Sequence, residues 1–371
     1  MKGALSVAEF ARYQRHLTLA GFGPAAQRLL KGGSVLVIGA GGLGCPALLY
    51  LAAAGVGRIV IVDDDRIEIS NLQRQVLFSE ADEGAPKAEA ATRRLRALNS
   101  AIVIEPRVER LTRDNALALV GACDVVVDGS DNFSTRYLVN DACVLADRPL
   151  VYGAVQGFSG QLSVFNWRGG PTYRCLFPEP PEPGSVPTCA EAGILGVLPG
   201  LIGTAQACEA IKLLTGIGEP LSGRLLLWDA LTMTTQTVKL AADPRSREIW
   251  ELPPVGYGEV CAPLAESPME IDVPDLRTAM AGTPALQLID VREGWERAAG
   301  SIEPSLHLPL DEMARSLALP SLAQFNPALP TIVYCAVGVR SLYGAQILRE
   351  RYGFREAVSL RGGYKDWVRR Q

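Results

Sequence analysis

Gly39-Ala-Gly-Gly-Leu-Gly44 follows the apolar run 34–38 and precedes the apolar run 46–54. A glycine turn between an expected strand and an expected helix lets a phosphate approach backbone N–H groups at the helix N-terminus. Asp63 ends the next expected strand, 58–62, where a carboxylate can hold ribose hydroxyls. The candidate nucleotide-binding residues are therefore Gly39, Gly41, Gly42, Gly44 and Asp63. The alternative, that the glycines serve only close helix–strand packing, is less favoured because strand, loop, helix and acid are in register.

The remainder of the first 250 residues continues this alternation. Pro86 fits the first position of a helix that runs to about Leu98, and the runs 102–104 and 124–128 are expected strands. The β-α-β-α order favours a parallel sheet with helices on both faces. Later runs read as antiparallel strands added at an edge, and the tail repeats the α/β pattern. The later runs are 161–166, 224–228 and 235–240, and the expected tail strands are 286–291, 332–334 and 357–360.

Composition bounds the class of protein. The chain has 371 residues, of which 48% are hydrophobic and 20% charged, with a formal net charge of −4. These values exclude a disordered or collagen-like chain and give no reason to expect a nucleic-acid or membrane partner. Eight cysteines without a signal peptide favour reduced thiols and a cytoplasmic location. A Pro/Gly-rich stretch predicts a linker at 251–268, between domains at 1–250 and 269–371.

Charged and polar residues cluster after the expected strands. Arg74 follows a polar segment that begins at Asp63, Lys87 opens the next helix, and Asp131-Asn132 follow the strand 124–128. Two cations can neutralise a triphosphate, and a carboxylate can hold Mg²⁺. Each residue alone is more simply a solvated surface group, but together they favour a phosphate-transfer site over a nicotinamide site.

The same residues carry a resemblance to a known family. Gly39–Gly44, the run 70–75 with Lys87, and 130–132 are similar to the MoeB/ThiF group of adenylyltransferases, which are related to ubiquitin-activating enzymes. The resemblance covers nearly all of 1–250. It implies a Rossmann-like, mostly parallel sheet with antiparallel additions. It also implies that ATP–Mg²⁺ is attacked by the C-terminal Gly-Gly carboxylate of a ubiquitin-like sulfur carrier.

The resemblance also implies roles for individual residues. Asp63 would hold ribose, Arg74 and Lys87 would bind phosphates, and Asp131 would bind Mg²⁺. Asn71 and Asn132 would line the nucleotide site. Arg15 would be an arginine finger that reaches the partner subunit's site, which implies a homodimer.

The cysteines raise three separate questions. Relatives often hold zinc with two Cys-x-x-Cys pairs, but here Cys175 and Cys261 each lack their partner, so we expect no structural zinc. Whether these two thiols pair stays open. Cys189 is a candidate for a covalent link to the activated carrier, although an inessential cysteine is an equal alternative. The remaining thiols outside the tail are expected to be core residues: Cys45, Cys123, Cys143 and Cys208.

The tail contains Cys335-Ala-Val-Gly-Val-Arg340 between an apolar strand and an expected helix. Loop N–H groups at a helix N-terminus stabilise a thiolate, and Arg340 adds positive charge. With Glu296 and the run 361–367, this loop resembles a single rhodanese domain covering about 270–371, which carries sulfur as a persulfide on Cys335. Gly338 belongs to the same persulfide loop. A cysteine phosphatase loop is the rival, but it has five residues between Cys and Arg, and this loop has four.

The sequence therefore predicts an enzyme with two activities, adenylation of a sulfur carrier and sulfur transfer from Cys335 to give a thiocarboxylate. The alternative is an adenylyltransferase with a regulatory or inactive rhodanese tail. The sulfur donor, such as a cysteine desulfurase or thiosulfate, stays open. So does the carrier, which can be MoaD-, ThiS- or Urm-like and serve molybdenum cofactor, thiamine, cysteine or tRNA thiolation.

Overall fold

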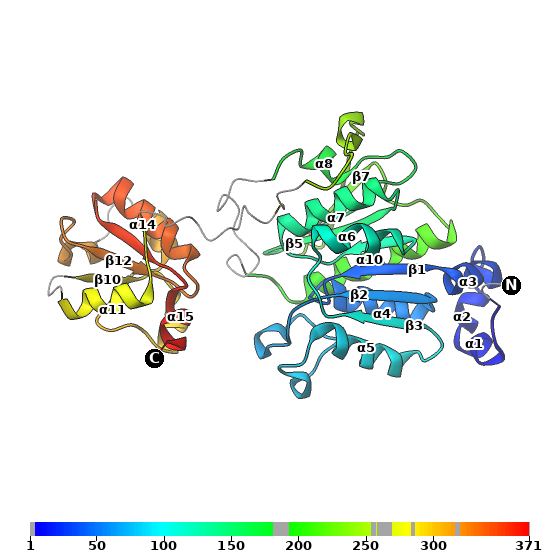
Figure 1. The fold of residues 1–371 in the computed structure, drawn as a ribbon, viewed down its shortest axis with the longest axis horizontal. Helices are drawn as coiled ribbons and strands as arrows, with labels where there is room; N and C mark the ends of the chain where they lie inside the picture. Colours follow the sequence, from blue (N-terminus) through cyan, green and yellow to red (C-terminus); the bar gives the residue numbers. More distant parts are fainter. Residues whose placement is uncertain are drawn as a thin grey trace. The chain divides into compact units, whose positions relative to one another are not determined.

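The computed structural model divides the polypeptide into two units, Met1–Val260 and Cys261–Gln371 (Figure 1). The structure describes residues 4–180, 193–253, 257, 269–282, 286–315 and 320–370. Each unit has its own sheet and its own buried clusters of apolar side chains, so each is considered by itself.

The first unit is built on an eight-stranded sheet in the order β3-β2-β1-β4-β5-β6-β7-β8. Its strands are β1 (Ser34–Ile38), β2 (Arg58–Val62), β3 (Val103–Arg107), β4 (Val125–Asp128), β5 (Leu150–Gln156), β6 (Ser159–Phe165), β7 (Arg224–Asp229) and β8 (Thr234–Lys239). The strands from β3 to β5 pair in parallel, and β5 to β8 pair antiparallel. From β1 the chain continues to one side through β2 and β3 and then returns to the other side as β4. Ligands of parallel α/β sheets bind at the carboxyl ends of strands where the order reverses in this way.

Helices cover both faces of this sheet. The described helices of this unit are α1 (Val7–Arg12), α2 (Gln14–Leu17), α3 (Gly23–Gly32), α4 (Gly44–Ala54), α5 (Lys87–Leu98), α6 (Arg113–Gly121), α7 (Phe133–Leu145), α8 (Tyr173–Leu176) and α10 (Val197–Thr215). Short 3₁₀ turns lie at Ile69–Asn71, Glu80–Asp82 and Pro244–Arg247. Side chains of α4, α5 and α10 share one apolar cluster with one face of the sheet, whereas those of α6 and α7 share another with the opposite face.

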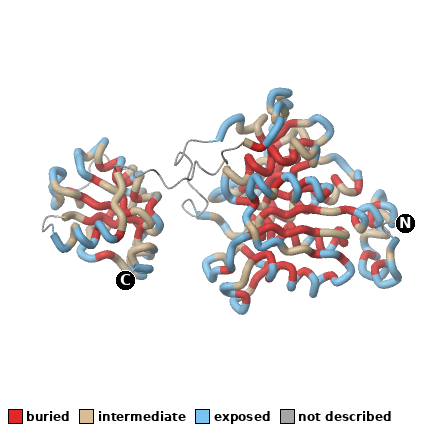
Figure 2. Tube along the Cα trace, viewed as in Figure 1, coloured by how far each residue is buried: buried red, intermediate tan, exposed pale blue. Residues whose placement is uncertain are grey.

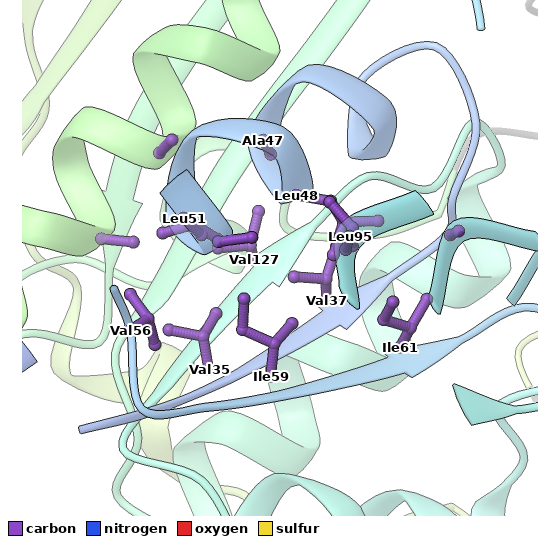
Figure 3. Packing of buried hydrophobic residues seen from close by; sticks show 14 of the residues in the cluster. Val35, Val37, Ala47, Leu48, Leu51, Val56, Ile59, Ile61, Leu95 and Val127 are labelled. Atoms are coloured by element: carbon purple, nitrogen blue, oxygen red, sulfur yellow. The ribbon is translucent and has the colours of Figure 1, made fainter. Parts of the chain in front are cut away.

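Alternation along the central strands explains this two-sided packing. Val35 and Val37 of β1 point toward Leu48 and Leu51 of α4, as Figure 3 shows. Leu36, between them on the strand, belongs to the cluster on the other face. A strand buried on both faces is apolar throughout, which is why β1, β2 and β4 appear as continuous buried segments in Figure 2.

Helix α10 is long and apolar enough, by length and composition, to cross a membrane. Half of its apolar window is buried within the unit, and it packs against α4, β5 and β6. Gln206 and Glu209 are buried along it, and Glu209 forms an ion pair with Lys212. We therefore interpret α10 as a core helix.

The second unit contains a five-stranded parallel sheet in the order β11-β10-β12-β13-β9. Its strands are β9 (Glu270–Ile271), β10 (Gln287–Asp290), β11 (Leu306–His307), β12 (Thr331–Tyr334) and β13 (Ala357–Leu360). Its helices are α11 (Val273–Gly282), α12 (Gly294–Ala298), α13 (Leu310–Arg315), α14 (Val339–Tyr352) and α15 (Gly363–Arg369), with a 3₁₀ turn at Pro320–Gln324. The predicted fold class is confirmed: a large, mostly parallel sheet with antiparallel additions is joined to a small α/β domain.

Candidate functional sites

The glycines of the loop between β1 and α4 have different structural roles. Gly39 has a φ of +85°, and a Cβ there would approach the Gly129 carbonyl oxygen to 3.0 Å. A Cβ on Gly44 would collide with the Gly39 carbonyl. A Cβ on Gly41 would meet only the Gln75 side-chain nitrogen, at 3.8 Å, in the described part of the chain. Two glycines are thus required by packing, whereas Gly41 leaves open space beside the loop.

Asp63 joins the end of β2 to this loop. Its Oδ2 accepts a hydrogen bond from the Ala40 N–H at 2.7 Å, and its Oδ1 accepts one from the Asp65 N–H at 2.8 Å. Burial raises the pKa of Asp63, and the Ala40 hydrogen bond and the positive charge of Lys87 oppose that increase. The carboxylate therefore lies beside the glycine loop, where the sequence predicts ribose binding.

Lys87 is buried at the start of α5, and both its side chain and its backbone N–H contact Asp65. Its Nζ lies 2.8 Å from Asp65 Oδ2, and its backbone N–H donates to the Asp65 carbonyl oxygen at 2.9 Å. Asp65 is mostly exposed, so the ammonium group is directed toward the solvent-facing side of the site. The sequence places Asp65 in the polar run 63–65 beside the expected site, but it does not show that Asp65 forms an ion pair with Lys87.

Arg74 lies next to the loop, because its Cγ would be 3.5 Å from a Cβ on Gly42. Its Nη1 donates to the Ser70 carbonyl oxygen at 3.1 Å. Asn71, in the same segment, accepts from the Glu68 N–H through Oδ1. Gln75 is buried, and its Oε1 has no hydrogen-bond partner among the described residues.

Polar residues also lie at and just after the carboxyl end of β4. Asp128 is buried and accepts from the Ser130 N–H at 2.9 Å, and burial raises the pKa of its carboxyl group. Asp131 is exposed. Asn132 accepts from the Thr135 N–H at 2.9 Å and so caps α7. The sequence analysis gave Asp128 only as the last residue of the expected strand 124–128.

Arg15 does not join this group of residues. It is exposed on α2, and the N-terminal helices pack at the C-terminal end of α4, where Tyr13 lies against Gly55 and Gln27 donates to the Ala54 carbonyl oxygen at 2.8 Å. The glycine loop lies at the other end of that helix, about 16 Å away for 11 residues. The structure therefore separates Arg15 from the glycine loop of its own chain.

Cys175 lies in a polar environment formed by backbone N–H groups and a hydroxyl. Its Sγ accepts from the Thr172 and Asp243 N–H groups, both at 3.3 Å, and lies 3.1 Å from Ser246 Oγ. Burial opposes ionisation, but these hydrogen bonds outweigh it and lower the pKa of Cys175. No group of three or more His, Cys, Asp or Glu is placed to hold a metal within the described ranges. Cys189 and Cys261 lie outside those ranges.

The other cysteines of this unit follow the prediction with one exception. Cys45, Cys123 and Cys143 are buried, and desolvation raises the pKa of each thiol. Cys208 is exposed, so its assignment to the core was wrong. It lies on α10 at a position that does not face the sheet, and the apolar residues around it in the sequence concealed this.

In the second unit, Cys335 directly follows β12 and is fully buried. Its Sγ accepts from the Gly338 N–H at 3.1 Å and from Ser341 Oγ at 3.5 Å. Gly338 has a φ of +103° and is the N-cap residue of α14, so the first amides of that helix lie next to the loop. The thiol therefore accepts hydrogen bonds from a loop amide and a hydroxyl, donors of the kind that would stabilise a bound sulfur anion.

The base of this loop is fixed by α15. The Tyr364 and Lys365 N–H groups donate to the carbonyl oxygens of Cys335 and Ala336 at 2.7 and 2.9 Å. A Cβ on Gly363 would collide with the same backbone. Because these two carbonyls are turned toward α15, the loop amides are free to face the sulfur.

Arg340 is paired with a carboxylate at the edge of the loop. Its two terminal nitrogens lie 2.8 and 2.6 Å from the two oxygens of Glu296. The positive charge of Arg340 is therefore partly neutralised by Glu296 of α12. The spacing between Cys335 and Arg340 in the sequence does not reveal this ion pair. A second pair, Arg292 and Asp290, is buried beneath it at 2.8 Å.

Comparison with known proteins identifies both units. The ThiF family model matches residues 13–248, and the rhodanese-like domain model matches residues 273–370. A Mycobacterium tuberculosis protein named probable adenylyltransferase/sulfurtransferase MoeZ is 44% identical over 377 residues, which cover 99% of this chain and 94% of that protein. A Zea mays adenylyltransferase and sulfurtransferase, MOCS3-1, is 40% identical over 99% of this chain and 83% of its own length.

Two further comparisons cover about two thirds of this chain. A Thermus thermophilus sulfur carrier protein adenylyltransferase is 53% identical over 242 residues, or 64% of this chain and 89% of that protein. The crystal structure of E. coli MccB with ATP superposes with a TM-score of 0.56 at 25% identity, covering 63% of this chain and 72% of that one.

Proposed function

The chain belongs to the ThiF family, and we propose that it uses ATP to adenylate the C-terminal glycine of a ubiquitin-like sulfur carrier and then converts that glycine to a thiocarboxylate. It is an adenylyltransferase and sulfurtransferase, since both kinds of domain are present in one chain and relatives that match its full length carry both names. The observation that carries the proposal is the convergence of Asp63, Arg74 and Lys87 on one glycine loop, in the same polypeptide as the buried thiol of Cys335.

The adenylation step needs charge neutralisation rather than a base. The carrier carboxylate is ionised at neutral pH, and it attacks the α-phosphorus of ATP while pyrophosphate leaves. Arg74 and Lys87 would screen the repulsion between carboxylate and phosphates, and Asp63 would accept hydrogen bonds from ribose. Asn71 and Asn132 would line the nucleotide. Asp131 would hold Mg²⁺, which neutralises phosphate charge when it is bound.

The sulfur-transfer step would occur on Cys335. A donor such as a cysteine desulfurase or thiosulfate would supply sulfane sulfur, and the Gly338 N–H and its neighbours would stabilise the persulfide anion. The terminal sulfur attacks the acyl carbon, AMP leaves, and an acyl disulfide to Cys335 forms. A thiolate, for which Cys189 is the candidate, then attacks Cys335 Sγ and forms a disulfide with it, and the thiocarboxylate leaves. A reducing thiol must open that disulfide before the next cycle.

The separation of Arg15 from the glycine loop supports a homodimer. An arginine that lies beyond the far end of α4 can contribute to catalysis only at another subunit's site, so we propose that it acts in the partner. We further propose that the enzyme works in the cytoplasm, where thiols remain reduced.

Carrier-dependent ATP–pyrophosphate exchange, combined with mass spectrometry of the carrier, tests the proposal. The unmodified chain should support exchange and increase the carrier mass by the difference between sulfur and oxygen. The variant Cys335→Ala should keep exchange and lose the mass change. Exchange that is absent with every Gly-Gly carrier would refute the adenylation step, and thiocarboxylate formation by Cys335→Ala would refute the role of the second unit.

A further inference from the structure

Two oppositely charged residues are buried beneath the turn that carries Asp131. Asp128 ends β4 and is 1% exposed, and Arg136 lies in the first turn of α7 and is 8% exposed. Neither has a role in the adenylation step as proposed. Burying a charge costs free energy unless the charge is paired and hydrogen-bonded, so the contacts of this buried pair indicate what it serves.

The buried pair holds both backbone groups of one residue, Ser130. The Ser130 N–H donates to Asp128 Oδ1 at 2.9 Å, and Arg136 Nη2 donates to the Ser130 carbonyl oxygen at 3.2 Å. The two charges also act on each other, since burial raises the pKa of Asp128 and the positive charge of Arg136 opposes that rise. The two peptide groups that flank the Ser130 Cα are therefore both fixed by buried charged side chains.

Neighbouring side chains hold the buried pair in turn. The guanidinium carbon of Arg136 lies 5.7 Å from the centre of the Phe133 ring and 5.6 Å from the centre of the Tyr152 ring. A cation over the face of an aromatic ring is attracted to it, most strongly where water is excluded. On the other side, the Asp128 carbonyl oxygen accepts from Nε2 of the buried Gln206 at 2.6 Å. The pair is thus part of a rigid arrangement at the carboxyl end of β4.

Asp131 lies between two fixed points of the backbone. On one side, Ser130 is held by the buried pair, and the Gly129 N–H donates to the last carbonyl oxygen of β1 at 2.8 Å. On the other side, Asn132 Oδ1 accepts from the Thr135 N–H at 2.9 Å and caps α7. Asp131 itself is exposed. The backbone of Asp131 is therefore ordered from both directions, while its side chain lies at the surface.

We propose that Asp128 and Arg136 are positioning residues, which act on the adenylation reaction through Asp131. This inference rests on the proposed function, in which the Asp131 carboxylate would hold Mg²⁺. That ion demands a near-ideal octahedral arrangement of oxygen ligands. A ligand carried on a mobile turn would lose free energy of binding, because the turn would have to be ordered at the same time. The buried pair supplies this order before the nucleotide arrives.

The variant Arg136→Lys tests the proposal in the full-length chain. Lysine keeps a positive charge near Asp128, but a flexible ammonium replaces the planar group that holds the Ser130 carbonyl oxygen. Isothermal titration calorimetry with α,β-methylene-ATP measures nucleotide affinity in Mg²⁺ and in EDTA, and we call the ratio of the two affinities the Mg²⁺ enhancement. We expect this enhancement to fall about tenfold, the usual effect of losing a partner that orients a metal ligand. Affinity in EDTA should stay unchanged, because Arg74 and Lys87 are untouched.

Two further variants keep the test independent of folding. Asp128→Asn/Arg136→Gln leaves no buried charge uncompensated, and it should show the same selective loss. The matched control is Arg148→Lys, since Arg148 donates to the Gly121 carbonyl oxygen at 3.2 Å before β4 and β5 begin, at the opposite end of these strands. This control should keep the full Mg²⁺ enhancement, and thermal unfolding of each variant verifies the fold.

A double-mutant cycle with Asp131→Ala shows whether Arg136 acts through Asp131. Asp131→Ala should abolish the Mg²⁺ enhancement, and adding Arg136→Lys should cause no further loss, because no carboxylate is left to position.

A loss in Asp131→Ala without a loss in Arg136→Lys would overturn the proposal. An equal loss in EDTA, or a further loss in the combined variant, would assign the pair to the fold alone. Full enhancement in Asp131→Ala would remove both the metal role of Asp131 and its positioning. If the unmodified chain shows no exchange with any carrier, the adenylation proposal fails, and the calorimetry still decides the positioning role.

Discussion

At the scale of single residues, Gly41 and Gly44 have opposite tolerances for a side chain. A Cβ at position 44 collides with the Gly39 carbonyl, whereas a Cβ at position 41 meets only Gln75 at 3.8 Å. We expect Gly44→Ala to lower the free energy of unfolding, because overpacking costs about 1–3 kcal/mol and the gain in helix propensity, roughly 1 kcal/mol, offsets only part of that cost. Urea unfolding of the full chain measures this loss.

Gly41→Ala should instead leave stability within about 0.5 kcal/mol and raise the KM for ATP, because the open space beside Gly41 is where a phosphate would approach the loop. Equilibrium unfolding and exchange kinetics on the same sample separate the two effects. A destabilised Gly41→Ala protein, or one with an unchanged KM for ATP, would contradict this division of roles.

A site residue could be predicted only where the local sequence determines which groups lie next to it. Asp63 and Lys87 were predictable as neighbours because each sits at the end or start of a regular element near the glycine loop. The hydrogen bond between Lys87 and Asp65 could not be predicted, because only the folded chain brings these two side chains, 22 positions apart in the sequence, to 2.8 Å. Cys208 was misassigned because periodicity in a largely apolar helix does not show which side faces the core.

At the scale of elements, the strands with continuous apolar runs were predictable, but β5 was not. It contains Gly153, which lowers strand propensity and which sequence alone cannot justify. In the fold, the Gln206 side chain of α10 lies where a Cβ of Gly153 would be, and its Nε2 donates to the Asp128 carbonyl oxygen at 2.6 Å. The glycine serves a contact between distant segments, so no local pattern could reveal it.

The pairing of α12 with α14 through Glu296 and Arg340 makes the second unit sensitive to acid. Burial tends to raise the pKa of Glu296, but the Arg340 and Glu293 hydrogen bonds lower it overall. A carboxyl with a lowered folded pKa contributes stability that is present above its unfolded pKa, near 4.3–4.5, and is lost as pH falls through the folded value. The pair should therefore stabilise the unit at pH 7 and progressively less below about pH 4.5.

Glu296→Gln should remove this pH dependence and lower stability at pH 7 by about 2 kcal/mol, because it leaves the half-buried Arg340 without its carboxylate. Hydrogen exchange of the β12 and α14 amides in the full chain measures the change. Glu312→Gln on the exposed side of α13 is the control and should stay within about 0.5 kcal/mol. Equal loss in both variants would show that the pair has no special contribution.

At the scale of the whole molecule, the two units were predictable because each has its own strand–helix pattern and buries its own clusters. What a single sequence does not give is the number of chains that build one site. Arg15 raises this question, since it lies beyond the far end of α4 from the glycine loop of its own chain. If Arg15 acts in catalysis, as we propose, two chains must share each site.

Mixed dimers test this sharing directly. Arg15→Ala and Arg74→Ala should each abolish carrier-dependent exchange alone, because every site then lacks one cation. When the two variants are co-expressed, half of the dimers are mixed, and each mixed dimer has one site with Arg74 from one chain and Arg15 from the other, so about a quarter of the normal activity should return. Arg74→Ala mixed with Lys87→Ala is the control: both cations belong to the same chain's site, no mixed dimer has an intact site, and activity should stay lost. Recovery in the control, or no recovery in the first mixture, would show that Arg15 does not act across the dimer.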